Sequence, residues 1–349
     1  MNNILNDVVG MKALDPDDML ARIREFPQQV RDAWENVSRW EVRNRSDRKI
    51  GGILVLGMGG SAIGADLVAG LLVDTLPIPM LVQRGYGVPA WVDEDTLVIA
   101  SSYSGGTEET LSGWAAAGAH HAQRIAVTTG GKLAALALAA DEALLTFSYE
   151  SQPRAALGHS FTLTLGLLWR LGLIYDPSDK VKAAVELLEA AQREWQPEVP
   201  IEECRPKQIA TWWHGQLPVI FGAEHLAIIA RRWTTQINEN SKSWALWAEM
   251  PELNHNVIVG FEHPTLMQQG ARVTGLRSKQ YHDRNAARFD ITGELLDQAD
   301  VAWATVEAAG DDRLGELLWT NLLGDYASYY LALLHGADPT PVEPIRYLK

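Results

Sequence analysis

The chain has little cysteine, no long apolar run and a shortage of positive charge, and each shortage excludes a class of protein. Cys204 is the only cysteine among 349 residues, so an internal disulfide is excluded and a reducing, cytoplasmic compartment is predicted. No stretch approaches the ~20 apolar residues of a membrane span, since Arg170 interrupts the apolar stretch at 160–175. The N-terminus lacks a basic region followed by an apolar run, so no signal peptide is expected.

The charge balance narrows the expected partners. Acidic side chains outnumber basic ones by 44 to 30, and the formal net charge is −14. Such a field disfavours nucleic acid and anionic membranes, so neither is an expected partner. No Cys, His and carboxylate set has metal-ligand spacing, so neither a metal nor another cofactor is predicted. A hydrophobic content of 47% provides for a sizeable core, and the length favours about two domains.

The order of strands and helices predicts two similar halves. After an N-terminal helical segment (1–48), short apolar strands alternate with Ala- and Leu-rich helices over 49–175, which is typical of a buried parallel sheet. A helical linker is predicted at 176–206, where Pro197, Pro200 and Pro206 fall near its end. The strand and helix rhythm then resumes over 207–349. The prediction is an α/β chain with two doubly wound, flavodoxin-like parallel sheets and peripheral helices.

Two turns of the first predicted sheet are rich in glycine and hydroxyl groups. The first, GMGGSA at 57–62, follows a strand, and the second, SSYSGGTEET at 101–110, follows another. Hydroxyls and free N–H groups at a helix N-terminus bind a phosphate monoester well. Single Ser and Thr residues more often cap helices, but four hydroxyls flanking two glycines exceed what a cap needs. The turns therefore predict a phosphate site.

The same glycines also satisfy a loose dinucleotide-binding pattern, G-x-G-x-x-A. A nicotinamide-binding sheet would carry an acidic residue at the end of its second strand to hold the ribose. Here that strand ends in Arg84, which would suit only a 2′-phosphate. An NADP-dependent reductase is therefore a weaker alternative.

Together these motifs resemble the sugar isomerase (SIS) domain. VIFGAEHLAIIARRWTTQINENSK at 219–242, followed by PELNHN, is similar to the second such domain of the bifunctional phosphoglucose/phosphomannose isomerase family, and QPRAALGHS at 152–160 resembles a further segment of that family. The resemblance covers most of the chain from about residue 50. It implies two SIS domains and an enzyme of carbohydrate metabolism, in glycolysis and gluconeogenesis, that interconverts fructose 6-phosphate with glucose 6-phosphate and mannose 6-phosphate.

The resemblance also implies roles for individual residues. Aldose–ketose interconversion needs a base that moves a proton between neighbouring carbons through a cis-enediol, and a carboxylate suits that task. Glu239 matches this base, and His255, sixteen positions later, matches a ring-opening histidine supplied by the other subunit of a homodimer. Arg154 matches an arginine that stabilises the enediolate, and Lys349 matches a lysine near the family's C-terminus. The implied phosphate-binding residues are Gly60, Ser61, Ser102, Ser104 and Thr107.

Several alternatives stay open at this stage. Glu252 precedes Asn254-His255-Asn256 and is a second candidate for the base, while His255 itself could be a capped turn residue. Val342 stands seven places before Lys349, where the family has Thr, so Thr340 is a candidate substitute and the preference between glucose and mannose phosphates is open. A non-catalytic sugar-phosphate-binding protein is the alternative function, although no basic DNA-binding helix pair precedes the first sheet.

Overall fold

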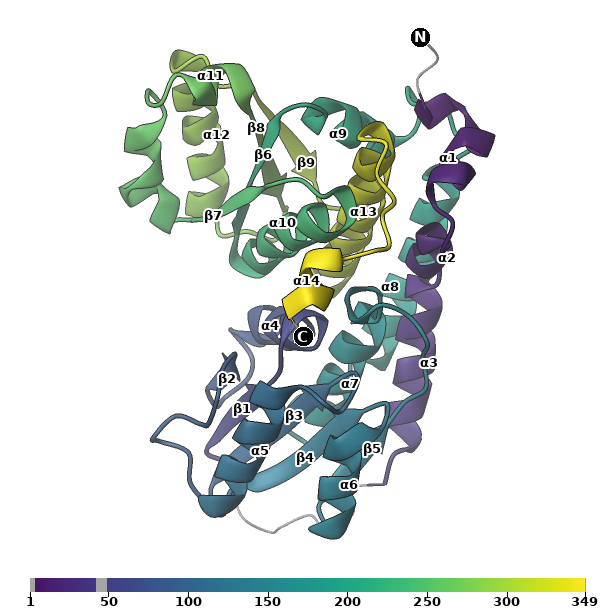
Figure 1. Cartoon of the computed structure of the whole chain (residues 1–349). Coiled ribbons are helices and arrows are strands. Elements are labelled where there is room, and N and C mark those ends of the chain that lie inside the picture. Colours follow the sequence, from purple (N-terminus) through teal and green to yellow (C-terminus); the bar gives the residue numbers. More distant parts are fainter. Residues whose placement is uncertain (1–3, 42–48, 349) are drawn as a thin grey trace. The chain divides into compact units, whose positions relative to one another are not determined.

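The computed structural model describes residues 4–41 and 49–348, and the chain divides into two compact units (Figure 1). The first-sheet unit is Phe26–Lys182, and the second-sheet unit combines Met1–Glu25 with Ala183–Lys349. The N-terminal helices are therefore shared between the two units. The predicted domain limits after residues 48, 175 and 206 stay predictions.

The first-sheet unit contains a five-stranded, all-parallel sheet. Its strands run in the order β2 (Met80–Gln83), β1 (Gly52–Leu56), β3 (Thr96–Ser102), β4 (Gln123–Thr128) and β5 (Ala143–Thr146). Every residue of β1 and β3 is buried, which is why both read as continuous apolar or small-residue runs. The order 2-1-3-4-5 is that of flavodoxin-like sheets, whose ligands bind beyond the carboxyl ends of the strands. The predicted fold class is confirmed.

Helices connect and cover these strands. The helical elements of this unit, apart from the boundary helix α8 (Ser178–Glu194), are α3 (Phe26–Arg39), α4 (Gly59–Leu72), α5 (Glu108–Ala119), α6 (Gly131–Ala139), the 3-10 turn η2 (Pro153–Ala155) and α7 (Leu157–Arg170). Helix α7 is buried along its first twelve residues, and it contacts both α3 and α4. A small residue on α4 lets these helices approach closely, because a Cβ on Gly64 would lie 2.4 Å from Ser160 Oγ.

The second-sheet unit repeats the topology with four parallel strands. Their order is β7 (Leu246–Met250), β6 (Leu217–Ala223), β8 (Ala271–Arg277) and β9 (Trp303–Glu307). The sequence pattern did not predict β7. It is an edge strand on which Leu246 and Trp247 are exposed, so it lacks the buried apolar run that marks the inner strands.

The helical elements of the second-sheet unit, in addition to its part of α8, are η1 (Ile4–Asn6), α1 (Val8–Leu14), α2 (Met19–Arg24), α9 (Arg205–Trp213), η3 (Glu224–Leu226), α10 (Ala227–Ser241), η4 (Glu252–His255), η5 (Val257–Gly260), α11 (Leu266–Gly270), α12 (Asp283–Gln298), α13 (Arg313–Leu334) and α14 (Glu343–Leu348). Helices α10 and α13 pack against each other, and Trp233 Nε1 donates a hydrogen bond to Thr320 O at 2.9 Å. Among the described residues, no helix combines the length and apolar character that a membrane crossing requires.

Candidate active site

The turn after β1 approaches a distant segment of its own unit. Gly59 has φ +50°, which glycine adopts without strain, and Gly60 lies at the start of α4. A Cβ on Gly60 would lie 2.5 Å from the carbonyl oxygen of Pro153, so no larger residue fits there without displacement. Ser160 Oγ donates a hydrogen bond to Gly60 O at 3.1 Å. The close approach of the Pro153 backbone to Gly60 places Arg154 beside the glycine turn.

The turn after β3 holds its hydroxyls within a compact network. Ser102 Oγ and Thr107 Oγ1 are 2.9 Å apart, and Gly105 N donates to Ser102 Oγ at 3.1 Å. Thr107 is the N-cap residue of α5, yet its side chain makes no capping hydrogen bond. Ser104 is exposed, and its Oγ accepts from Gly106 N. Single-residue helix capping therefore does not account for this cluster.

The two turns are joined directly. Tyr103 N donates to Ser61 Oγ at 3.3 Å, so the β3 turn is hydrogen-bonded to the first helical turn after β1. The cavity enclosed there is only about 10 Å³, room for about one water. It is lined by Gly60, Ser61, Ser101, Tyr103, Val127, Phe147, Pro153, Ala156 and Ser160. The three sequence motifs of this unit are thus packed together at the carboxyl ends of β1 and β3.

Arg154 brings a positive charge to this region. It lies in η2 and is 4% exposed, and Gln29 Nε2 donates to the neighbouring Ala155 O at 2.8 Å. Electrostatic interactions of a guanidinium this far from water are weakly screened. Arg84, the cation of the NADP alternative, is paired with Asp66. The guanidinium that would bind an NADP 2′-phosphate is therefore already engaged in an ion pair.

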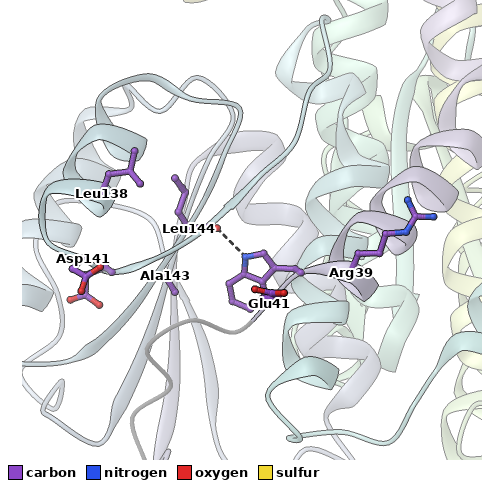
Figure 2. A pocket seen from close by; sticks show the side chains of 8 residues that line it. Arg39, Glu41, Leu138, Asp141, Ala143 and Leu144 are labelled. Atoms are coloured by element: carbon purple, nitrogen blue, oxygen red, sulfur yellow. Dashed lines mark hydrogen bonds between the residues drawn. The ribbon is translucent and has the colours of Figure 1, made fainter.

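A larger pocket lies elsewhere in the first-sheet unit. It measures about 430 Å³ and is lined by residues at the end of α3, at the end of α6 and at the start of β5. Trp40 is one of its lining residues, and its Nε1 donates to Leu144 O at 3.0 Å; Figure 2 shows Leu138, Asp141 and Leu144 around the pocket. Since β5 begins here, this pocket is at the amino end of its strand, opposite to the edge at which doubly wound sheets bind ligands. The volume of this pocket is therefore no evidence of an active site.

In the second-sheet unit, α10 carries Glu239 two residues before the helix ends. Its side chain is half-buried, and Lys242 Nζ donates to Glu239 O at 2.6 Å. Arg232 lies seven residues earlier, on the same face of the helix, and is 2% exposed. Burial lowers the pKa of this guanidinium, against the opposing effects of the Asp325 and Glu239 carboxylates. Arg232 was not among the sequence candidates, although its heptad spacing to Glu239 was a usable signal.

A polar cluster fixes α10 against α13. Arg232 NH2 lies 3.7 Å from Asp325 Oδ1, and Asn321 Nδ2 donates to Asp325 Oδ2 at 3.0 Å. Burial raises the pKa of Asp325, while Arg232 and two amide donors oppose that shift. Closer to Glu239, Asn240 Nδ2 donates to Ser328 Oγ at 3.0 Å. Residues of α10 before and after Glu239 are therefore both anchored to α13.

The segment after β7 contains the remaining candidates. Both Glu252 and His255 are exposed on η4, and Asn256 Nδ2 donates to Glu252 Oε1 at 2.7 Å. Near the C-terminus Thr340 is buried and Val342 is half-buried, whereas Lys349 lies outside the described residues. Within 4–41 and 49–348, no group of three or more His, Cys, Asp or Glu side chains is placed to hold a metal ion.

The second sheet does not repeat the open glycine turn. Glu224 follows β6 with φ +48°, at the place where Gly59 follows β1 with φ +50°. Its Oε1 accepts from His282 N at 2.8 Å and from Asn285 Nδ2 at 2.9 Å. A carboxylate of the chain itself therefore occupies donors at the start of α12, which corresponds to α5 of the first sheet.

Two flavodoxin-like sheets, the first with hydroxyl-rich turns, form the architecture expected of a sugar isomerase domain protein. Residues 202–349 match the family described as the bacterial phospho-glucose isomerase C-terminal SIS domain. The fold is also that of the C-terminal domain of glucosamine-fructose-6-phosphate aminotransferase from Francisella tularensis. The two chains have a TM-score of 0.70 at 15% identity, and the match covers 93% of this chain and 98% of the other.

Two curated relatives extend the similarity over nearly the full length. The bifunctional phosphoglucose/phosphomannose isomerase of Caldicellulosiruptor bescii is 40% identical over 332 residues, which cover 95% of this chain and 98% of the relative. The enzyme of the same name from Aquifex aeolicus is 32% identical, and the match covers 92% of this chain and 96% of the relative. The chain belongs to the bifunctional phosphoglucose/phosphomannose isomerase family.

The close contact at Gly60 can be tested by adding one methyl group. We expect Gly60→Ala to lower the free energy of unfolding by about 1–3 kcal/mol, because the new Cβ must displace the Pro153 backbone. Gly51→Ala is the control, since its nearest neighbours would lie at 3.7 and 3.8 Å, an ordinary contact distance. Urea unfolding followed by fluorescence measures both. Equal midpoints for the two variants would contradict the close approach.

Proposed function

We propose that the protein is an aldose–ketose isomerase that interconverts fructose 6-phosphate with glucose 6-phosphate and mannose 6-phosphate. The observation that carries the proposal is the 40% identity to a bifunctional isomerase across 95% of the chain. The grouping of three motifs around Gly60 supports it independently. The single, buried Cys204 is consistent with a reducing cytoplasm, where this interconversion would serve glycolysis and gluconeogenesis.

The phosphate is proposed to bind at the first sheet. Its ligands would be the hydroxyls of Ser61, Ser102, Ser104 and Thr107 with the N–H groups of Gly60 and the first turn of α5. Ser104 is already exposed, and Thr107 is not engaged as a helix cap. These two residues are therefore the best placed of the four hydroxyls to exchange their present contacts for a phosphate.

The proton transfer is proposed to use the remaining candidates. Glu239 would remove the proton beside the carbonyl and return it to the neighbouring carbon. The fixed charge of Arg154 would stabilise the enediolate, an effect that is strong where water is excluded. His255 would open the sugar ring by moving a proton between the ring oxygen and the anomeric hydroxyl. A contribution of Lys349 to the site is proposed from the family resemblance alone.

A direct assay tests the function. Purified protein supplied with fructose 6-phosphate is expected to form both glucose 6-phosphate and mannose 6-phosphate, detected separately by coupled dehydrogenases. Calorimetry with fructose 6-phosphate accompanies the assay. Binding without either product would favour the non-catalytic sugar-phosphate-binding protein, and neither binding nor product would refute the proposal.

The choice of base is tested by two matched carboxylate changes. Glu239→Gln is expected to lower kcat by about two orders of magnitude or more with fructose 6-phosphate binding retained, because only the proton acceptor is removed. Glu252→Gln removes a carboxylate that already accepts a hydrogen bond from Asn256, and it should keep most of the turnover. The opposite pattern would identify Glu252 as the base.

A homodimer with shared sites is proposed from the topology of one chain. Glu239 lies at the end of α10 that leads into β7, whereas His255 follows the other end of β7. The four residue steps of this strand span about 13 Å. A ring-opening group and a base that act on one sugar need a shorter separation, so His255 is proposed to serve the Glu239 of a partner chain.

The surface around His255 supports such an interface. Edge strand β7 and its flanking segments expose the side chains of Trp244, Leu246, Trp247, Val257 and Val259 by 40% to 82%. Exposed apolar groups along an unpaired sheet edge are typical of contact surfaces. A two-fold interface formed there would bury these groups and would bring His255 into the contact with the partner.

Mixing two inactive dimers tests the shared site. If His255 serves the partner chain, a heterodimer of Glu239→Gln and His255→Ala chains has one intact site and one doubly altered site. Re-annealed equal mixtures, about half heterodimer by statistics, should recover about one quarter of wild-type turnover. Native mass spectrometry measures the heterodimer fraction. A mixture that contains heterodimers but stays as inactive as its parents would assign His255 to its own chain or to no catalytic role.

A further inference from the structure

Tyr103 joins several parts of the first-sheet site but has no role in the proposed chemistry. It is the first residue after β3, and its backbone connects the ends of three strands. Its N–H donates to Ser61 Oγ in the turn after β1, and its carbonyl oxygen accepts from Thr129 Oγ1 at 2.7 Å, just after β4. These backbone bonds do not depend on the side chain of Tyr103.

The side chain of Tyr103 reaches a different segment. Its hydroxyl accepts a hydrogen bond from Ser151 N at 3.0 Å and donates one to Tyr149 O. Both partners belong to the strand-free segment between β5 and η2, which leads within three residues to Arg154. The Tyr103 hydroxyl therefore hydrogen-bonds two backbone groups of the segment that leads to Arg154. Segments without secondary structure have few other means of fixing their backbone.

We propose that Tyr103 is a positioning residue that fixes Arg154 relative to the phosphate-binding turn. The backbone of Tyr103 belongs to that turn, and its hydroxyl holds the segment that leads to Arg154. A charge that stabilises an enediolate must be placed accurately, since a displacement of about 1 Å can cost about 100-fold in rate. The inference rests on the proposed function, in which Arg154 acts on the enediolate.

Removal of one hydroxyl tests this role. Tyr103→Phe is expected to lower kcat with fructose 6-phosphate about tenfold and to change KM by less than about twofold, because the phosphate-binding groups keep their backbone bonds. The affinity for inorganic phosphate in calorimetry should likewise change by less than about twofold. Unchanged kcat would overturn the inference, and so would a loss confined to phosphate affinity.

Tyr149→Phe is the matched control. It deletes the same group, here from the segment that Tyr103 binds, but the Tyr149 hydroxyl accepts from Gln29 Nε2 at 2.9 Å. Gln29 keeps its hydrogen bonds to Ala155 O and Gly158 N after the change. The control should keep kcat within about twofold, and the two variants should have similar melting temperatures. Equal losses of kcat in both variants would indicate a general loosening of the segment and would refute a specific role of Tyr103.

A double variant tests whether Tyr103 acts through Arg154. Arg154→Met keeps the apolar stem of the buried side chain and removes its charge. If Tyr103 acts by positioning that charge, adding Tyr103→Phe to Arg154→Met should lower kcat by less than about twofold further. A full additional tenfold loss would show that Tyr103 acts elsewhere. If Arg154→Met alone keeps normal turnover, the proposed role of Arg154 is wrong. If Arg154→Met is slow but Tyr103→Phe keeps normal turnover, only the proposed role of Tyr103 is wrong.

Discussion

The contact between the start of α4 and the segment 153–160 is the constraint on which the first-sheet site depends. A Cβ on Gly60 would lie 2.5 Å from Pro153 O, and one on Gly64 would lie 2.4 Å from Ser160 Oγ. Gly60 and Gly64 are one helical turn apart, so they form a single small-residue face on α4. This face admits the polypeptide that carries Arg154 beside the glycine turn. Larger residues at these two positions would clash with that polypeptide and displace the backbone of Arg154 from the turn.

The two sheets share a topology, but their first turns differ in what they leave accessible. Gly59 and Glu224 have nearly the same positive φ, +50° and +48°. Glycine leaves the first turn open, whereas the Glu224 carboxylate takes up the N–H of His282 and the amide of Asn285. In the second sheet, therefore, a carboxylate of the chain itself accepts hydrogen bonds from donors at the start of α12. This difference agrees with the proposal that phosphate binds at the first sheet.

The second-sheet unit has a matching device for holding its candidate base. The ion pair of Arg232 and Asp325 and the hydrogen bond of Asn240 to Ser328 join α10 to α13 on either side of Glu239. Buried polar groups of this kind contribute little net stability, but they specify one arrangement of two helices. A carboxylate that must shuttle a proton between neighbouring carbons benefits from such a fixed backbone. The same unit leaves His255 exposed beyond β7.

The sequence by itself determined the alternation of strands and helices, the flavodoxin-like class and the hydroxyl-rich turns, because these depend on local periodicity and on residues close in the chain. It failed for β7, since the exposed Leu246 and Trp247 of an edge strand lack the burial pattern of an inner strand. The tertiary structure alone decided that Arg84 pairs with Asp66 and that Tyr103 hydrogen-bonds the segment before Arg154. These contacts join residues 18 and 48 positions apart. No local pattern encodes such pairs, because they form only when packing brings distant segments within hydrogen-bonding distance.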